Sequence, residues 1–338
     1  MPSHPTIIDV ASEAGVSKST VSRVLRGDGS SVREETRDKV WAAVKRLGYE
    51  HNAVASSLRT NRTYTVMLAI PDITNPFWPE VARGVQDAVE AHGYAVVLSN
   101  SDWDVERERR FLRLAGRNRF DAIAINPTGV TSAELHATRI PTVILGVRED
   151  YRDFDMVGSD SYGGTIQALE HLYGLGHRRI ALIRGRHRGA RGRARLAAYE
   201  EFLTDHDLPH DPALSVEGPF DLAGGAEAMR TLLALKDPPT GVLAANDILA
   251  IGAMQAAHQA SLDIPADLSI VGMDDIYSAS TTNPPLTTLA KAKYEIGRQA
   301  ARFLLDRMEG KAPAVPRRQV IACRLIERSS TGPPKVAT

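Results

Sequence analysis

A group of polar side chains near the N-terminus has the composition of a nucleic-acid contact. Lys18, Ser19, Ser22 and Arg23 are spaced so that a helix would carry them on one face. Ammonium, guanidinium and hydroxyl groups are the donors that bind phosphates and the edges of bases. The same residues would also suit the solvated face of an ordinary helical hairpin, so the surrounding elements decide between the two interpretations.

The stretch before these residues predicts a helix followed by a sharp turn. Thr6 and Asp9 have the spacing of a capping box, in which each side chain bonds a free backbone N–H group. Gly15 ends this helix, because glycine adopts a positive φ at little cost. The buried face of the first helix is predicted to consist of Val10, Ala11 and Ala14.

A second helix begins after Ser17, a good capping residue. Two short helices joined by a three-residue turn that contains glycine form a helix-turn-helix, whose second helix can enter the major groove of DNA. Ser31 and Glu34 then predict a third helix from about residue 32 to residue 47. The predicted buried faces are Val21, Val24 and Leu25 in the second helix and Trp41, Val44 and Leu47 in the third.

The 338 residues have the composition of a globular protein of two or three domains, with 43% hydrophobic and 24% charged residues. The net charge is zero, but residues 1–62 hold ten Lys and Arg against seven Asp and Glu. Of the 41 basic and 41 acidic residues, 31 and 34 therefore lie in the remainder. A basic head on a slightly acidic body is typical of a protein that contacts phosphates with its head alone.

The sequence predicts few other partners. Cys323 is the single cysteine, which excludes an intrachain disulfide and a cysteine-cluster metal site. His206 and His210 are separated by Pro209, so we expect no metal and no cofactor. No apolar run approaches the roughly 20 residues that span a bilayer, and the N-terminus lacks a signal-peptide pattern. We expect a cytoplasmic protein without membrane contact.

From Thr65 onward, short apolar runs alternate with amphipathic segments, which is typical of βαβ units in parallel sheets. The number of units favours two lobes. The predicted fold is thus a small all-α helix-turn-helix head and a two-lobed α/β core with Rossmann-like parallel sheets. Predicted strands include residues 66–70, 94–99, 122–125, 143–145, 179–183, 241–245 and 268–271, and predicted helices include 77–92, 161–175, 191–206, 248–261 and 291–308.

Motifs of enzymes are absent where they would be clearest. The chain has no Walker loop, and no nucleophile–base arrangement is visible. The segment from Gly185 to Gly189 contains two glycines, but they lack the dinucleotide-binding spacing. We therefore do not expect an enzyme.

Three segments of the head resemble a known family. DVASEAGVSKSTVSRVLRG, REETRDKVWAAVKRLGY and NAVASSLR, in this order, are similar to the DNA-binding head and hinge of the lactose-repressor (LacI/GalR) family of bacterial transcription regulators. In that family the hinge folds into a helix on operator DNA, and a leucine of each subunit enters the minor groove. Leu58 matches that leucine, although the segment also suits a plain linker. The implied DNA contacts are Thr6, Ser17, Lys18, Ser19, Thr20, Ser22, Arg23, Asn52, Ala55 and Leu58.

The body resembles the effector-binding domain of the same family, which is built like a periplasmic sugar-binding protein. The matching stretches are residues 75–78, 93–94, 176–180, 245–247, 272–275 and 324–328. In this architecture three crossovers join the lobes, here near residues 159–161, 288–291 and 320–323, and a small sugar-like molecule binds between the lobes. The implied effector contacts are Phe77, Trp78, Arg191, Arg195, Phe220, Asn246 and Asp274.

Several of these positions have alternative interpretations. Phe77 and Trp78 would also pack a helix, Asn246 would also serve as a helix cap, and a register shift would exchange Asp274 for Asp275. The sequence also departs from the family. Gly146 stands where many relatives have an aspartate, Arg191 where they have a small polar residue, and Ala198 where they have glycine.

The arginines suggest the charge of the effector. Residues 184–195 contain six arginines and one histidine, and Arg191 and Arg195 are one helical turn apart. Two guanidinium groups that converge without an acidic partner favour a sugar acid or sugar phosphate over a neutral sugar. If Asp274 neutralises Arg195, the site is instead effectively neutral.

These observations predict three regions: a DNA-binding domain at 1–50, a hinge at 51–63 and an effector-binding core at 64–338. The first lobe would comprise about 64–160 and 291–320, and the second about 161–288 and 321–330. We predict a homodimeric, ligand-responsive regulator, most simply a repressor, on a pseudo-palindromic double-stranded operator. Residues 329–338 lack leucine heptads, so a tetramerising tail helix is not expected. The alternatives are a solute-binding module without a DNA role and a cleft enzyme.

Overall fold

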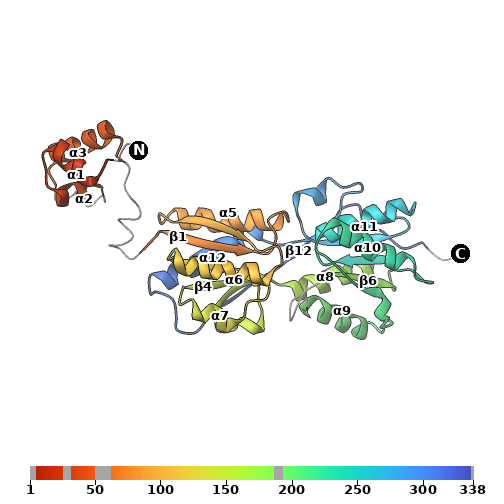
Figure 1. Ribbon diagram of the computed structural model, residues 1–338. Coiled ribbons are helices and arrows are strands. Elements are labelled where there is room, and N and C mark those ends of the chain that lie inside the picture. The colour runs from red at the N-terminus through yellow and green to blue at the C-terminus, as the bar shows by residue number, and fades with distance from the viewer. Residues whose placement is uncertain (1–4, 26–31, 50–61, 186–192, 336–338) are drawn as a thin grey trace. The chain divides into compact units, whose positions relative to one another are not determined.

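The structure is a computed structural model, and it describes residues 5–25, 32–49, 62–185 and 193–335. The chain forms two compact units, Met1–Thr63 and Tyr64–Thr338, which are described separately below as the head and the core. Figure 1 labels their elements.

The described part of the head contains three helices, α1 (Ile7–Ala14), α2 (Lys18–Leu25) and α3 (Glu34–Leu47). Thr6 and Asp9 form the predicted capping box, and Gly15 ends α1 with φ 64°. The three helices enclose a small core of Val10, Ala11, Val21, Val24, Val40 and Ala43. The local sequence signals therefore account for the first two helices.

The third helix differs from the prediction. It begins at Glu34 after Arg33, and no side chain caps it. Its buried residues are Val40 and Ala43, while Val44 and Leu47 pack against them from the side. Trp41 is 51% exposed, so the predicted buried face is wrong at that position. The preceding residue, Val40, is buried instead. The small residue Ala43 allows α3 to approach α1, where Arg46 pairs with Glu13 at 3.1 Å.

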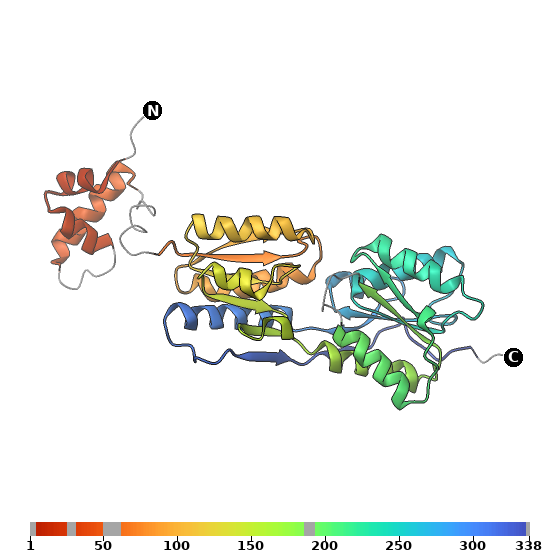
Figure 2. The same cartoon turned by 60° about the horizontal axis from the view of Figure 1, so that its bottom comes forward.

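The core consists of two six-stranded sheets, which confirms the predicted two-lobed α/β architecture. Figures 1 and 2 show the two lobes side by side, each with helices on both faces of its sheet. The first lobe has the order β11-β5-β4-β3-β1-β2 and is entirely parallel. Its strands are β1 (Thr65–Ile70), β2 (Ala95–Asn100), β3 (Ala122–Ile125), β4 (Thr142–Leu145), β5 (Asp155–Ser159) and β11 (Arg318–Ile321).

The sheet of the second lobe has the order β12-β10-β9-β8-β6-β7, and only β12 runs antiparallel to its neighbour. The strands missed from the sequence are mostly short or carry exposed residues, which weakens the apolar signal. The strands of this lobe are β6 (Ile180–Gly185), β7 (Ser215–Gly218), β8 (Gly241–Ala244), β9 (Ser269–Asp274), β10 (Thr287–Ala290) and β12 (Arg324–Ile326).

Each sheet buries apolar side chains on both faces. In the first lobe α5 (Phe77–Glu90) and α12 (Lys293–Met308) cover one face, and α6 (Val105–Arg117) and α7 (Ser132–Ala137) cover the other. In the second lobe α10 (Leu222–Leu233) and α11 (Asp247–Gln259) lie opposite α8 (Ser161–Gly174) and α9 (Arg193–Asp205). No helix among the described residues is long and apolar enough to cross a membrane.

The chain passes between the two sheets three times. It leaves β5 for α8 at Asp160, leaves β10 for α12 at Lys291 and Ala292, and leaves β11 for β12 at Ala322 and Cys323. The first and third crossovers touch, because the Cys323 thiol donates to the Asp160 carbonyl at 3.3 Å.

Glycines allow α5 and α12 to pack with their backbones in contact. A Cβ at Gly297 would lie 2.0 Å from the Val81 carbonyl oxygen, and one at Gly84 would lie 2.0 Å from the Tyr294 carbonyl oxygen. Neither obstacle is a flexible side chain, so any larger residue must separate the helices.

We therefore expect Gly297→Ala to lower the free energy of unfolding of the core by about 1–3 kcal/mol, the usual cost of overpacking. Urea unfolding measures this. Gly116→Ala in α6 is the matched control, because no atom lies within 4 Å of its Cβ position. There the helix propensity of alanine should stabilise by roughly 0.5–1 kcal/mol. Equal effects at both sites would contradict the close contact.

Candidate functional site

The head presents polar side chains on the outer face of α2. Lys18, Ser19 and Arg23 are exposed, and Thr20 and Ser22 are half-buried. The helix begins with a hydroxyl cluster in which Ser17 Oγ accepts from the Thr20 N–H at 3.1 Å and lies 2.8 Å from the hydroxyls of Ser19 and Thr20. Because Val21 and Val24 are buried against the other helices, the cationic face must point outward.

Other predicted DNA contacts lie elsewhere. Thr6 is committed to the cap of α1, where its backbone N–H donates to Asp9 at 2.7 Å. Asn52, Ala55 and Leu58 fall outside the described residues, so the hinge contacts stay predictions.

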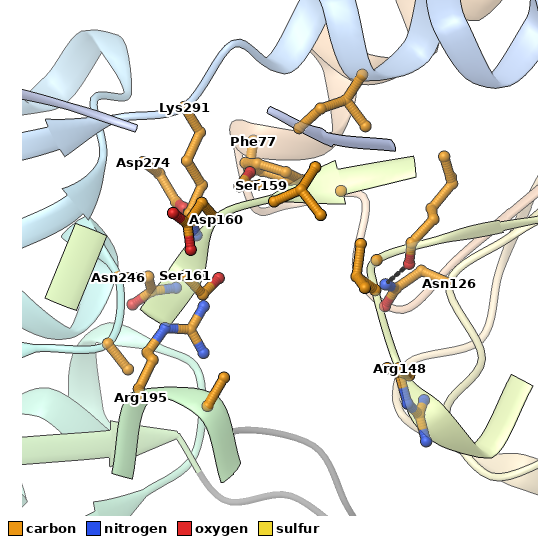
Figure 3. Close-up of a pocket in the computed structure, with 18 of the residues that line it drawn as sticks. Phe77, Asn126, Arg148, Ser159, Asp160, Ser161, Arg195, Asn246, Asp274 and Lys291 are labelled. Atoms are coloured by element: carbon orange, nitrogen blue, oxygen red, sulfur yellow. Dashed lines mark hydrogen bonds and ion pairs between the residues drawn. The ribbon is translucent and has the colours of Figure 1, made fainter. Parts of the chain in front are cut away.

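The core contains a cleft of about 480 Å³ whose walls come from both lobes. Figure 3 shows Arg195, Asn246 and Asp274 on one wall and Asn126 and Arg148 on the opposite wall. The cleft lies at the carboxyl ends of the parallel strands, where open α/β sheets bind ligands. Six of the predicted effector contacts line it: Phe77, Trp78, Arg195, Phe220, Asn246 and Asp274. Arg191 lies outside the described residues.

The aromatic pair in the first lobe begins α5. Asn75 accepts from the Phe77 N–H at 3.0 Å and thereby fixes the start of the helix. Phe77 and Trp78 contact edge to face at 4.9 Å. Trp78 is only 7% exposed and belongs to the core of the lobe, so most of its ring serves packing while its edge reaches the cleft.

Asp274 is the last residue of β9, and Asn246 lies two residues past the end of β8, both in the second lobe. Asn246 caps α11 by accepting from the Leu249 N–H at 2.9 Å, and it also lines the cleft, so both interpretations of this residue apply. Asp274 lines the cleft, whereas Asp275 pairs with Arg328 at 2.6 Å.

A buried lysine holds Asp274. Lys291, in the second crossover, donates from Nζ to Asp274 Oδ1 at 2.8 Å, and both side chains are less than a tenth exposed. Lys293 donates to the carbonyls of Asp274 and Asp275 at 2.9 and 2.6 Å and lies 3.2 Å from Glu80 of α5. Through Lys293, the end of β9 in the second lobe is thus bound to the first turn of α12 in the first lobe, next to α5.

Arg195 is therefore not paired with Asp274 as the neutral alternative required. Its Nε lies 3.3 Å from Met273 Sδ, a weak acceptor and its one hydrogen bond to the part of the chain that the structure describes. Burial lowers the pKa of Arg195, and the charge of Asp274 acts in the opposite direction. The guanidinium group consequently retains donors that face the cleft (Figure 3).

Sequence reasoning missed several cleft residues. Asn126 is the first residue after β3 and Asn246 the second after β8, so an asparagine just past a buried strand is a signal that could have identified Asn126. Lys291 was assigned to a helix start, and Arg148 and Trp103 lie in loops without a motif.

Trp103 and Phe220 join the two lobes across the cleft. Their rings stack at a centroid distance of 5.3 Å and an angle of 10°. The ring of Phe220 lies against Gly185. A Cβ added at Gly185 would come within 1.8 Å of the Phe220 ring. Trp103 has a positive φ of 60°, a conformation that few non-glycine residues adopt. The two aromatic residues therefore form a contact that must change when the lobes move.

Comparison with known proteins places these features in a family. Residues 6–52 match the model of the lacI family of bacterial regulatory proteins, and residues 169–331 match a periplasmic binding protein-like domain. The ribose operon repressor of Escherichia coli (strain K12) is 37% identical over 307 residues, which cover 90% of this chain and 93% of that protein. The chain belongs to the lacI family.

Two solved structures extend the likeness of this lacI-family chain to three dimensions. The lac repressor dimer bound to operator and the anti-inducer ONPF matches with a TM-score of 0.88 and 29% identity over 98% of this chain and 100% of that one. A LacI family transcriptional regulator from Enterococcus faecium with bound ribose matches with a TM-score of 0.72 and 30% identity over 80% and 100%.

A fully buried carboxyl lies behind the cleft wall of this lacI-family core. Asp247 accepts from the Thr288 hydroxyl at 2.5 Å and from the Ile276 N–H at 2.8 Å. Burial, and to a lesser extent the charge of Asp274, raises the pKa of Asp247 to about 7. Between pH 3.8, the pKa in the unfolded chain, and about pH 7, the folded protein holds a proton on Asp247 that the unfolded chain has lost.

Because the folded state binds more protons between pH 4 and 7, the contribution of Asp247 to stability falls as the pH rises through that window, by at most about 1.4 kcal/mol per pH unit. Asp247→Asn removes this titration. We expect the free energy of unfolding of the wild type, relative to the variant, to decrease from pH 4.5 to pH 7 and to stay constant above. Glu200→Gln, an exposed carboxylate in α9, is the control and should show no such slope. A flat difference for Asp247→Asn would contradict the raised pKa.

Proposed function

We propose that this chain is a ligand-responsive transcriptional regulator, most simply a repressor, that binds a pseudo-palindromic operator as a homodimer and changes its affinity when a carbohydrate-like effector enters the cleft. The observation that carries the proposal is the combination, in one lacI-family chain, of an exposed cationic face on α2 and a two-lobed cleft with donors on both walls. A module that only binds solutes does not require an exposed cationic face on α2.

The DNA contacts are proposed for the exposed face of α2. Lys18, Ser19 and Arg23 are the donors that reach outward, and the positive dipole end at the N-terminus of the helix favours phosphate. We assign the hinge contacts to Asn52, Ala55 and Leu58 and the three regions to residues 1–50, 51–63 and 64–338.

Exposed apolar residues support a dimer formed by the core. β2 is an edge strand, and Val97 and Leu98 on it are 41% and 37% exposed. Leu222 and Tyr277 of the second lobe are 44% and 82% exposed. Unpaired strand edges and exposed apolar side chains are disfavoured in monomers, and a twofold dimer matches a twofold operator. Sedimentation of residues 64–338 tests whether the core alone is dimeric.

The effector is proposed to be a carbohydrate that carries an acidic or phosphate group. Aromatic edges, amides and paired charges in one cleft suit a ring with many hydroxyls. Asp274 is occupied by Lys291, and Gly146 brings no carboxylate to the facing wall, so Arg195 lacks a fixed anionic partner among the described cleft residues. An anionic group on the ligand would supply it.

Arg23→Ala should weaken binding to the specific operator by roughly 1–3 kcal/mol and change binding to random DNA little, because a base contact is lost and not a phosphate contact. Gel shifts with both DNAs measure the difference. Arg46→Ala, on α3 and paired with Glu13, is the control and should not discriminate between the two DNAs. Equal losses on both DNAs for Arg23→Ala would reassign Arg23 to the phosphates.

Matched neutral, acidic and phosphorylated sugars should raise the melting temperature unequally, with the larger shift for an anionic member. Arg195→Gln should remove that excess, because it deletes the charge at the cleft wall. Arg230→Gln, an exposed arginine of the same lobe paired with Glu227, should leave it unchanged. Stabilisation by neutral sugars alone, unaffected by Arg195→Gln, would refute the anionic effector and leave the regulator proposal standing.

A further inference from the structure

The first lobe contains a second cavity of about 620 Å³ beside the cleft. We call it the annex. It lies among three loops at the carboxyl ends of β2, β3 and β4, around Trp103, Thr131 and Tyr151. Trp103, Arg148 and Asp150 line both the cleft and the annex. These three residues therefore belong to the walls of both spaces where the two adjoin.

Arg148 at the junction has an unused donor. Its Nη1 donates to the Pro127 carbonyl at 2.9 Å, and its guanidinium group lies 4.6 Å from the centre of the Tyr151 ring. Its Nε is buried and has no hydrogen-bond partner in the part of the chain that the structure describes. A buried N–H group without an acceptor is costly, and an oxygen of a bound molecule would satisfy it.

The other charged side chains described here around the annex already have hydrogen-bond or ion-pair partners. Glu108 is 1% exposed and accepts from the N–H groups of Thr128, Gly129 and Val130 at 2.6, 3.0 and 3.1 Å. Arg109 donates to Glu134 at 2.6 Å, and a second carboxylate, Glu106, also binds it. The two arginines that line the annex are thus already bound to carboxylates or a carbonyl, which favours an uncharged occupant.

The remaining walls are apolar surfaces and hydroxyls. The lining includes the apolar or aromatic residues Trp103, Val105, Val130 and Tyr151 and the hydroxyl-bearing residues Thr131 and Ser132. Aromatic and aliphatic surfaces that alternate with hydroxyls suit the C–H face and the hydroxyl edge of a sugar ring.

We propose that the annex binds the second, uncharged ring of a two-ring carbohydrate effector whose first ring occupies the cleft. Arg148 Nε donates to an oxygen at the junction between the rings, and Trp103 contacts both units. This inference rests on the proposed effector role of the cleft and specifies the size class of the effector.

The test is isothermal titration calorimetry on the full chain with matched pairs of sugars: glucose with cellobiose, xylose with xylobiose, galactose with lactose, and gluconate with cellobionate. In at least one pair the disaccharide should bind ten times or more tightly than its monosaccharide. An aryl glycoside of the same sugar serves as a further arm. If the aryl glycoside gains affinity and the disaccharide does not, the sugar-ring assignment is overturned.

Filling the annex gives the site-specific control. Ala133 lines the annex and Ala137 does not, and both are exposed residues of α7. Ala133→Phe should raise the Kd of the disaccharide to within twofold of the monosaccharide and leave the monosaccharide unchanged, whereas Ala137→Phe should change neither. Arg148→Met should reduce the ratio between the two affinities.

The outcomes separate the two proposals. If monosaccharides bind and alter operator affinity but no disaccharide gains, or if Ala133→Phe has no effect on a disaccharide that does gain, the annex proposal alone is refuted. If no sugar of the panel binds, and the phosphorylated sugars of the melting-temperature series do not bind either, the carbohydrate effector and the annex are both refuted.

Discussion

The buried contact between Asp274 and two lysines holds the core together at the place where the lobes meet. Asp274 and Asp275 both have positive φ, at 127° and 54°, which is unfavourable for residues with a side chain. Lys291 binds the Asp274 carboxylate at 2.8 Å, and Lys293 binds both carbonyls. Removing either charge would leave the other buried without a partner, which is strongly destabilising. The end of β9, a cleft wall and the second crossover are thus one electrostatic unit.

Much of the fold was predictable because burial leaves a clear signal in parallel strands. β1, β3 and β4 are buried on both faces and read as apolar runs. β7 and β11 have half-exposed patterns and gave no such run. Trp41 shows the other limit, since an apolar residue at helical spacing was placed in the core although the contact with α1 required the smaller Ala43.

The candidate site was predictable where a residue lies at or just past the end of a strand, as Asp274 and Asn246 do. It was not predictable where a long side chain returns from a crossover or a loop. Lys291 and Arg148 reach the cleft through four and three methylene groups respectively, and sequence spacing does not specify their direction. That Asp274 pairs with Lys291 and not with Arg195 required the three-dimensional structure.

The position of Asp274 gives a physical route from ligand to lobe arrangement. A ligand that bonds to its carboxylate competes with Lys291, which lies in a crossover, whereas Lys293 holds the backbone carbonyls of the same strand end from the first turn of α12. The stack of Trp103 on Phe220 is the second interlobe contact at the cleft, and it depends on the same relative position of the lobes. A ligand that favours one arrangement of these contacts must shift the population of the lobes by its difference in affinity, and DNA binding, if it prefers the other arrangement, must weaken the ligand by the same factor.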